Sequence, residues 1–187
     1  MGAVILETYR LILRPWREED APRLYDLCRD PEIGPAAGWN VHRSVEESRE
    51  VIRTVLSGPR VWAITLRDSE LPVGSVGLKD TTAVEDPEPE LGYWVGRAYW
   101  GRAYVPEACE AVLEYCFTML GERRVWCAHY EDNDRSRRVI MKCGFMPMFT
   151  RLEWVEPLNE ERRCRYYALT VEQWRVRHNT RSWRVKQ

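Results

Sequence analysis

Hydrophobic and polar positions along the chain follow two different periods. Alternation with a period of two predicts strands, and spacing of three to four residues predicts helices. The predicted strands cover residues 9–14, 61–66, 73–79, 90–95, 124–130, 145–155 and 162–170. The predicted helices cover residues 17–30, 104–120 and 133–143, and a further helix starts at Ser44, where Glu47 completes a capping box, and ends near Gly58. This order predicts one layered α/β (α+β) domain, with a mixed sheet and helices on its faces.

Length and composition agree with a single folded domain. The chain has 187 residues, of which 44% are hydrophobic and 30% charged, enough for a substantial core. No apolar run approaches the roughly 18 residues of a membrane span, and the first residues lack the apolar core of a signal peptide. We therefore expect a cytoplasmic protein without a membrane partner.

The charge balance excludes some classes of partner. Lys and Arg total 28 and Asp and Glu total 29, so no overall positive charge calls for DNA. Residues 171–187 carry five basic side chains and one acidic one, and we interpret them as a short basic tail after a domain of residues 1–170. The six cysteines form no C-x-x-C pair, so we expect reduced core thiols and no metal site.

The segment around the predicted strand 90–95 carries the most informative chemistry. The loop 96–103 (GRAYWGRA) leads into a helix near Tyr104, and no Ser, Thr, Asp or Asn directly precedes that helix to cap its free N–H groups. Gly101 lets a ligand approach the backbone, and Arg102 adds a positive charge. These features indicate an anion site, most naturally for a pyrophosphate, or alternatively an ordinary strand-to-helix turn. The lysine of a P-loop and the G-x-G-x-x-G of a dinucleotide fold are both missing.

Four motifs follow one another along the chain: RLILR (10–14), DPEI (30–33), ELGYWV continuing into GRAYWGRAYVPEA (90–108), and N-D-R-S with K-C-G-F (133–145). Together they resemble the GNAT superfamily of N-acetyltransferases, in the branch of the ribosomal-protein N-terminal acetyltransferases RimJ and RimL. The resemblance covers roughly residues 6–170. It implies a single domain with a mostly antiparallel sheet of about six to seven strands. It also implies acetyl-CoA as co-substrate and a primary amine as acceptor.

The resemblance assigns cofactor-binding residues one by one. The strand residues Tyr93, Trp94 and Val95 match main-chain contacts to pantetheine. The pyrophosphate donors match the main-chain N–H groups of Trp100, Gly101, Arg102, Ala103 and Tyr104. Asn133 matches an asparagine that binds the cofactor, although it can also serve as a helix cap. The chain departs from the family pattern at Arg97, Ala98 and Ala103, and at Ile140, which replaces the usual general-acid tyrosine.

The implied reaction is direct attack of a neutral amine on the thioester, which needs a base and a group that assists the thiolate. Glu90 is the candidate base, and its alternative is a carboxylate at a strand end or one that binds the acceptor. Ser136 is the candidate acid, with Tyr130 in reserve. We reject a covalent route through Cys127 or Cys143, because the nearby His129 has no evident third partner.

The acceptor stays open among a protein N-terminus, a polyamine and an aminoglycoside-like antibiotic. The loop 80–90 carries five carboxylates and no basic residue, so it either attracts a cationic amine or is simply solvated. The segment 31–43, with Trp39 and His42, is expected to cover the acceptor side by resemblance. The sequence is compatible with a homodimer and does not decide the oligomeric state. The alternative function is a catalytically inactive acyl-CoA-binding sensor or interaction module.

Overall fold

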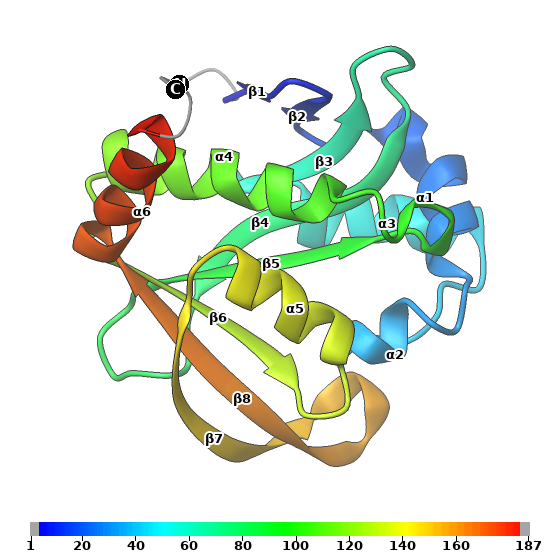
Figure 1. Cartoon of the computed structure of the whole chain (residues 1–187). Helices are drawn as coiled ribbons and strands as arrows, with labels where there is room; N and C mark the ends of the chain where they lie inside the picture. The colour runs from blue at the N-terminus through cyan, green and yellow to red at the C-terminus, as the bar shows by residue number, and fades with distance from the viewer. Residues whose placement is uncertain (1–3, 184–187) are drawn as a thin grey trace.

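The computed structural model describes residues 4–183, built around one eight-stranded sheet (Figure 1). The strand order is β1-β2-β3-β4-β5-β6-β8-β7, and every neighbouring pair is antiparallel except the parallel pair of β5 and β6. The strands are β1 (Leu6–Glu7), β2 (Leu11–Arg14), β3 (Val61–Leu66), β4 (Pro72–Asp80), β5 (Pro89–Val95), β6 (Arg124–Tyr130), β7 (Met146–Val155) and β8 (Glu160–Thr170). The prediction of a mixed, mostly antiparallel sheet is confirmed, with one strand more than the expected range.

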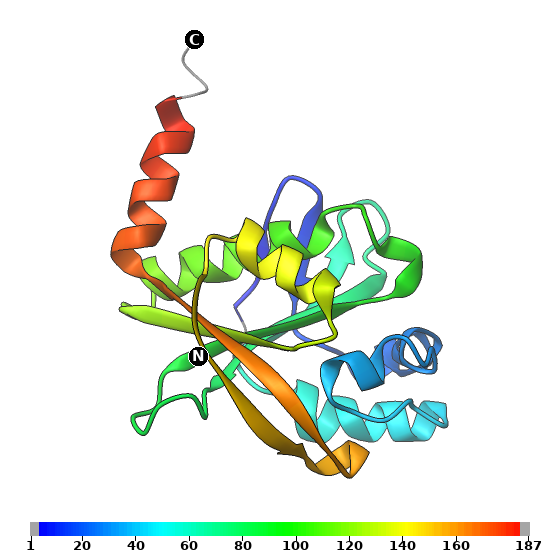
Figure 2. The ribbon, with the colours of Figure 1, turned by 60° about the horizontal axis from the view of Figure 1, so that its bottom comes forward.

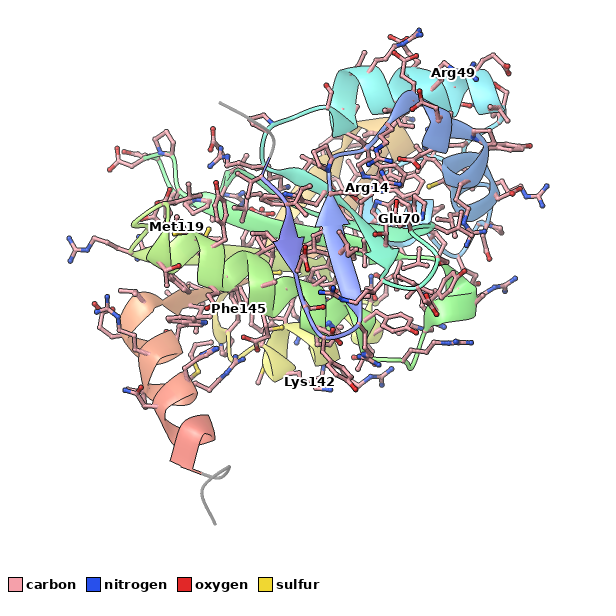
Figure 3. All side chains as sticks on the ribbon, turned by 90° about the horizontal axis from the view of Figure 1, so that it is seen from above. Arg14, Arg49, Glu70, Met119, Lys142 and Phe145 are labelled. Carbon is pink, nitrogen blue, oxygen red and sulfur yellow. The ribbon has the colours of Figure 1, made fainter. Side chains whose placement is uncertain are left out.

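Helices cover both faces of this sheet (Figure 2). One face carries α4 (Tyr104–Thr118) and α5 (Asp134–Lys142), and the other carries α1 (Ala21–Cys28) and α3 (Val45–Val51). Phe145, which is 1% exposed, lies among the side chains between α4, α5 and α6 (Val171–Trp183) (Figure 3). Successive residues of β3 face opposite sides of the sheet, because Trp62 packs in the α4 core and Ala63 in the core beneath α1 and α3.

Ser44 caps the second predicted helix as expected, but only this half of the predicted capping box forms, because the Glu47 carboxylate accepts from the Arg43 N–H at 2.6 Å; the helix itself is shorter than expected. Ser44 Oγ accepts a hydrogen bond from the Glu47 N–H at 3.1 Å. The α-helix α3 ends at Val51 and continues as a π-helical turn, η2 (Ile52–Leu56). The short helix η1 (Glu18–Asp20) precedes α1.

The punctuated segment 31–43 contains a helix that the hydrophobic pattern did not indicate. This helix, α2 (Gly34–Ala37), has Pro35 in its first turn and ends at Gly38, whose φ is +90°. Proline is tolerated in a first turn and a left-handed glycine ends a helix, so the same residues that suggested a loop define a single helical turn.

The segment 171–187, expected as a basic tail, contains the helix α6. Its basic side chains dominate the sequence pattern, but Val171 and Trp174 are buried in the main core. The Trp174 ring lies 5.5 Å from the Phe117 ring of α4. Residues 184–187 lie outside the described part of the chain. None of the described helices is long and apolar enough to cross a membrane.

Candidate functional site

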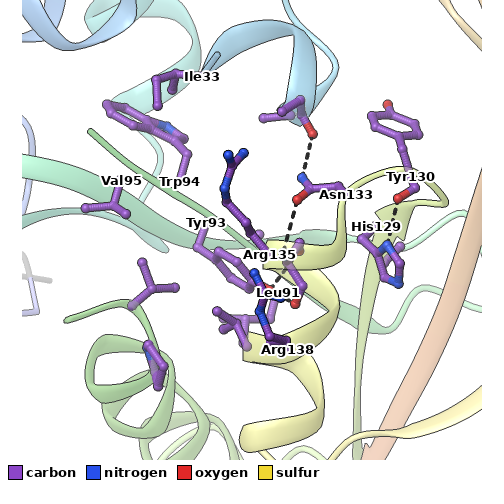
Figure 4. A pocket seen from close by; sticks show the side chains of 18 of the residues that line it. Ile33, Leu91, Tyr93, Trp94, Val95, His129, Tyr130, Asn133, Arg135 and Arg138 are labelled. Carbon is purple, nitrogen blue, oxygen red and sulfur yellow. Dashed lines mark hydrogen bonds between the residues drawn. The ribbon is translucent and has the colours of Figure 1, made fainter. Parts of the chain in front are cut away.

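A gap in the sheet opens between the two parallel strands. β5 and β6 pair only at Glu90 with Trp126 and at Leu91 with Cys127, whereas the other edge of β5 stays paired to β4 as far as Val95. Beyond Leu91, the edge of β5 that faces β6 therefore has no strand paired to it. A cavity of about 590 Å³ occupies this opening (Figure 4). Its lining comes from residues 32–37, β4, β5, the loop 99–106, β6, α5, β7 and β8.

One end of the cavity is formed by main chain. The short helix η3 (Arg97–Tyr99) and the first turn of α4 line it, and no side chain of the described residues caps α4. Ala103, at the cap position, has a φ of +60°, and Gly101 has a φ of +76°. A Cβ at Gly101 would have no atom within 4 Å. The uncapped N–H groups and the open space fit an anion, which agrees with the chemistry predicted for this loop.

One side chain of the loop and others from the β1–β2 region hold this loop in place. The Trp100 Nε1–H donates to the Val95 carbonyl at 3.1 Å, and an Arg10 N–H donates to the Arg102 carbonyl at 3.0 Å. Glu107, in the first turn of α4, accepts hydrogen bonds from Thr8 and Arg10. Burial opposes its ionisation, yet these hydrogen bonds keep the pKa of Glu107 below its usual range. The Glu107 carboxylate is thus engaged with the β1–β2 region.

Basic side chains of α5 add positive charge beside the main-chain end. Arg135, Arg138 and Lys142 all line the cavity. The Arg135 guanidinium lies 4.0 Å from the centroid of the Trp100 ring, and its nitrogen lies 3.8 Å from a Glu32 carboxylate oxygen. Arg135 therefore reaches from α5 to the Trp100 ring of the loop, and Figure 4 shows its side chain projecting from α5 into the cavity.

Asn133 is engaged on both sides of its amide group. Its oxygen accepts from the Ser136 N–H at 3.0 Å, which caps α5, and its nitrogen donates to the Ala36 carbonyl of α2 at 3.0 Å. The predicted cap is thus present, and the same side chain ties α2 to α5. The amide nitrogen carries two hydrogens, so a second one is left to donate.

Two hydroxyl groups meet where α5 lies beside β5. Tyr93 Oη lies 2.9 Å from Ser136 Oγ and 3.2 Å from the Ser136 carbonyl oxygen. Both residues line the cavity. Ile140, one turn further along α5, is 1% exposed and faces the core, so this position offers no proton donor to the cavity.

The opposite end of the cavity is formed by side chains around Glu90. This residue is 5% exposed. Its Oε2 accepts from the Thr81 hydroxyl at 2.6 Å, and its Oε1 lies 3.0 Å from Lys79 Nζ. Lys79 pairs directly with Glu90 across β4 and β5. A carboxylate that lines a cavity and is held by two partners is suited to accept a proton or to bind a cation.

A second carboxylate at this end was not predicted. Glu153 of β7 lines the cavity and accepts hydrogen bonds from the Tyr166 hydroxyl and from Arg151, the latter at 2.6 Å. Burial, followed by the hydrogen bond with Glu153, raises the pKa of Tyr166. The Thr82 hydroxyl oxygen lies 3.5 Å from the Tyr166 hydroxyl oxygen. No sequence motif links these residues, since the order of the strands alone brings them together.

The acidic loop is largely neutralised in the folded protein. An Asp80 oxygen lies 3.2 Å from an Arg60 nitrogen, and Glu88 accepts from Arg124 at 2.7 Å. The hydrogen bond from Arg124 holds the pKa of Glu88 below its ordinary value, against the effect of burial. Glu85 and Asp86 are exposed. Three of the five predicted carboxylates therefore pair with basic side chains, counting Glu90 with Lys79.

The structure offers no activated cysteine among the described residues. Cys127 and Cys143 are each 1% exposed, and burial raises the pKa of Cys127 well above its usual value. The two ring nitrogens of His129 lie 2.7 Å from the Tyr130 carbonyl oxygen and 3.0 Å from the Tyr167 hydroxyl, and burial lowers its pKa. His129 is thus a neutral, fully bonded side chain, which supports rejecting the covalent route.

The other aromatic and histidine candidates have clear positions. Tyr130 lines the cavity, and burial raises its pKa. The Trp39 ring packs 5.9 Å from the Trp94 ring, and Trp94 lines the cavity. His42 is buried, with Nδ1 2.7 Å from Ser48 Oγ.

The comparison with protein families identifies the domain. The model described as "Acetyltransferase (GNAT) domain" matches residues 10–146. The chain belongs to the GNAT acetyltransferase family. The matched segment includes the loop before α4, Lys79 and Glu90, and α5, whereas Glu153 and Tyr166 lie beyond it.

Similar proteins agree with this GNAT assignment. The "Uncharacterized N-acetyltransferase YoaA" of Bacillus subtilis (strain 168) is 30% identical over 147 residues, which are 75% of this chain and 82% of YoaA. An acetyltransferase (GNAT family) structure from Bacillus anthracis superposes with a TM-score of 0.80 at 20% identity, covering 90% of this chain and 99% of that chain. Mycobacterium smegmatis RimJ in complex with CoA-disulfide has a TM-score of 0.72 at 20% identity, covering 91% and 89%. The two structural matches show the same fold.

Proposed function

We propose that this GNAT protein transfers an acetyl group from acetyl-CoA to a primary amine, by direct attack within a ternary complex. The acceptor is a protein N-terminus or a small-molecule amine. One observation carries the proposal: a single cavity joins an uncapped helix start and a free strand edge to a buried carboxylate. An anionic thioester fits the first end, and an amine fits the second.

The main-chain end has the donors that coenzyme A requires. The N–H groups from Gly101 to Tyr104 would hold the pyrophosphate, with Arg102 adding positive charge. The Trp100 N–H, also expected as a donor, is already used, because it donates to the Arg97 carbonyl at 3.1 Å. The unpaired edge of Tyr93, Trp94 and Val95 would bind the pantetheine amides. The free hydrogen of the Asn133 amide offers one more donor.

Glu90 acts as the base in this mechanism. An alkyl ammonium has a pKa near 10, so it must lose a proton before it can attack a thioester. The Glu90 carboxylate takes that proton, directly or through one water, while Lys79 and Thr81 hold it in place. The C–N bond forms, the C–S bond breaks, and the electron pair of the C–S bond stays on sulfur. The second proton that nitrogen loses as the amide forms leaves to solvent water. Ser136 lies on the α5 side of the cavity, where it can assist the departing thiolate.

A release assay tests the proposal. The wild-type protein is incubated with acetyl-CoA and a panel of N-terminal peptides, polyamines and aminoglycosides, and both free coenzyme A and acetylated product are measured. We expect one class of amine to yield equal amounts of coenzyme A and acetyl product. Tight binding of acetyl-CoA without turnover across the panel would contradict the enzyme and favour an acyl-CoA-binding module.

A further inference from the structure

The hydroxyl pair of Tyr93 and Ser136 joins β5 to the first turns of α5 inside the cavity. Tyr93 has one hydroxyl hydrogen and two acceptors within reach, the Ser136 hydroxyl oxygen at 2.9 Å and the Ser136 carbonyl oxygen at 3.2 Å. The direction of the Ser136 hydroxyl hydrogen depends on which of these two oxygens accepts the hydrogen bond from Tyr93. If Tyr93 donates to the carbonyl, Ser136 can donate back to Tyr93, and its hydrogen is then consumed within the pair.

The local geometry favours the other arrangement. A carbonyl within an α-helix already accepts from the N–H four residues later, and Ser136 lies in α5 with six further helical residues after it. The hydroxyl oxygen is also the closer acceptor. A Tyr93 hydrogen on Ser136 Oγ leaves the hydrogen of Ser136 free to point elsewhere, and Ser136 itself lines the cavity.

Tyr93 is suited to remain a donor. Burial raises its pKa well above the usual value, with smaller contributions from neighbouring cysteines, so its hydroxyl stays protonated across the neutral range. Its ring packs against the main core, which restricts the directions in which the hydroxyl can point. A hydroxyl that accepts one hydrogen bond becomes a stronger donor of the next, because successive hydrogen bonds polarise each other.

We propose that Tyr93 is a positioning residue, whose hydroxyl donates to Ser136 Oγ and so directs the Ser136 hydrogen at the sulfur of the departing coenzyme A. The inference rests on the proposed function. The C–S bond breaks with its electron pair on sulfur, and the Ser136 O–H donates a hydrogen bond to that thiolate. No proton leaves Ser136 or Tyr93, and the proton of the amine passes to Glu90.

The test is a titration of the thiol of bound coenzyme A, which needs no acceptor. The ultraviolet absorbance of the thiolate is followed against pH for the wild type, Tyr93→Phe, Ser136→Ala and the double variant. Tyr115→Phe is the matched control: it also removes a phenol oxygen, but Tyr115 packs on Trp62 and does not line the cavity. The pKa of the bound thiol also depends on the charged residues of the cavity, among them Glu90, Arg135 and Arg138. These residues are the same in the wild type and in all four variants, so only the differences in thiol pKa between the proteins are interpreted.

We expect Ser136→Ala to raise the pKa of the bound thiol by roughly one unit, about the effect of losing one charge-assisted hydrogen bond. Tyr93→Phe should raise it by roughly half as much, and the double variant no further than Ser136→Ala alone. With an active acceptor, Tyr93→Phe should lower kcat several-fold while the Kd of acetyl-CoA stays within twofold. Tyr115→Phe should behave as wild type.

Three results would contradict the inference, and they distinguish a failure of the Tyr93 role from a failure of the proposed function. An unchanged thiol pKa in Tyr93→Phe, with coenzyme A still bound, overturns the role of Tyr93 and leaves the proposed function standing. Additive effects of the two substitutions also overturn it, because Tyr93 would then act independently of Ser136. If wild type binds no coenzyme A, the inference and the proposed function both fail. An unfolding curve for each variant confirms that the compared proteins are folded.

Discussion

The two ends of the cavity are constructed in different ways. The end near α4 consists mainly of main chain from one continuous segment, the loop 96–103 and the first helical turn. The end near Glu90 consists of side chains from β4, β5, β7 and β8, which are brought together only by the strand order. A site made from one segment leaves a motif in the sequence, whereas a site assembled from four strands leaves none.

The difference has a functional counterpart. Every residue except proline supplies the same main-chain N–H group, so the α4 end is defined by conformation and is suited to a constant ligand such as a phosphate. The other end depends on the identity of each side chain, and there Glu90 and Glu153 face Lys79 and Arg151. We infer that the α4 end determines the cofactor and the Glu90 end determines the chemistry and the acceptor.

The largest expected effect comes from the Glu90 end. Glu90→Gln keeps the shape and the contact with Thr81 but removes the base, so kcat should fall by about 10²- to 10⁴-fold. The stabilisation of the fold by acetyl-CoA should persist. Initial rates at saturating acetyl-CoA measure the change.

Glu85→Gln is the matched control for that substitution, because it neutralises an exposed carboxylate of the same acidic loop. Its kcat should stay within about twofold of wild type, since an exposed charge is screened by solvent. A Glu90→Gln protein with wild-type kcat would remove the distinction between the two ends.

A substitution at Gly101 tests the α4 end. Gly101→Asp places a negative charge in the phosphate site, and a 100-fold weaker affinity would reduce the stabilisation at 100 times the original Kd from about 2.7 to about 0.4 kcal/mol. Gly101→Ala controls for backbone strain, because its φ of +76° costs any β-carbon residue about 1–2 kcal/mol while the Cβ meets open space. Thermal unfolding with and without acetyl-CoA measures both.

We expect Gly101→Ala to lose stability yet keep most of its response to acetyl-CoA. An equal response of Gly101→Asp and wild type would show that the phosphates bind elsewhere.

The pH dependence of stability reports on the β6 side of the cavity. Burial lowers the pKa of His129 in the folded protein, so the unfolded chain binds more protons below about pH 6.5 and stability falls as the pH drops through that value. The slope from one histidine is at most about 1.4 kcal/mol per pH unit. His129→Gln should flatten the curve below about pH 6.5, and His42, whose pKa burial also lowers, contributes in the same range.

Denaturant unfolding at several pH values provides the data for that comparison. Curves of identical slope for wild type and His129→Gln would contradict a buried neutral His129.

The smallest expected effect is at Ala103. This residue holds a left-handed conformation, with a φ of +60°, where glycine is the residue without strain. Ala103→Gly relieves that strain but adds flexibility to the unfolded chain, so the two terms nearly cancel. We expect a change of less than about 1 kcal/mol in the free energy of unfolding and unchanged acetyl-CoA binding. A loss above 2 kcal/mol would mean that the methyl group has a packing role.

Local patterns predicted most of the scaffold because each element carries its own period. The strands β3 and β6 and the start of α4 match the predicted bounds. The helix α2 escaped prediction because a four-residue turn that contains Pro35 and precedes Gly38 looks like a loop. The helix α6 was not predicted, because its many basic residues suggested a solvated tail, whereas in the structure Trp174 packs against Phe117.

The candidate site also has parts that the local sequence predicts and parts that depend on the strand order. The loop around Gly101 could be found from its residues, since conformation and small side chains are encoded locally. Lys79 opposite Glu90 was accessible in principle, because the two lie on adjacent predicted strands. Glu153 and Tyr166 could not be placed, because their approach depends on β8 inserting between β6 and β7.

Thermal unfolding of the wild type with acetyl-CoA, coenzyme A, Mg-ATP or buffer alone tests the central claim most directly. At 100 times its Kd, a ligand adds about 2.7 kcal/mol, or roughly 5–11 °C for a domain of this size. The account predicts that acetyl-CoA and coenzyme A raise the midpoint and that Mg-ATP does not. An unchanged midpoint with millimolar acetyl-CoA and coenzyme A would contradict it.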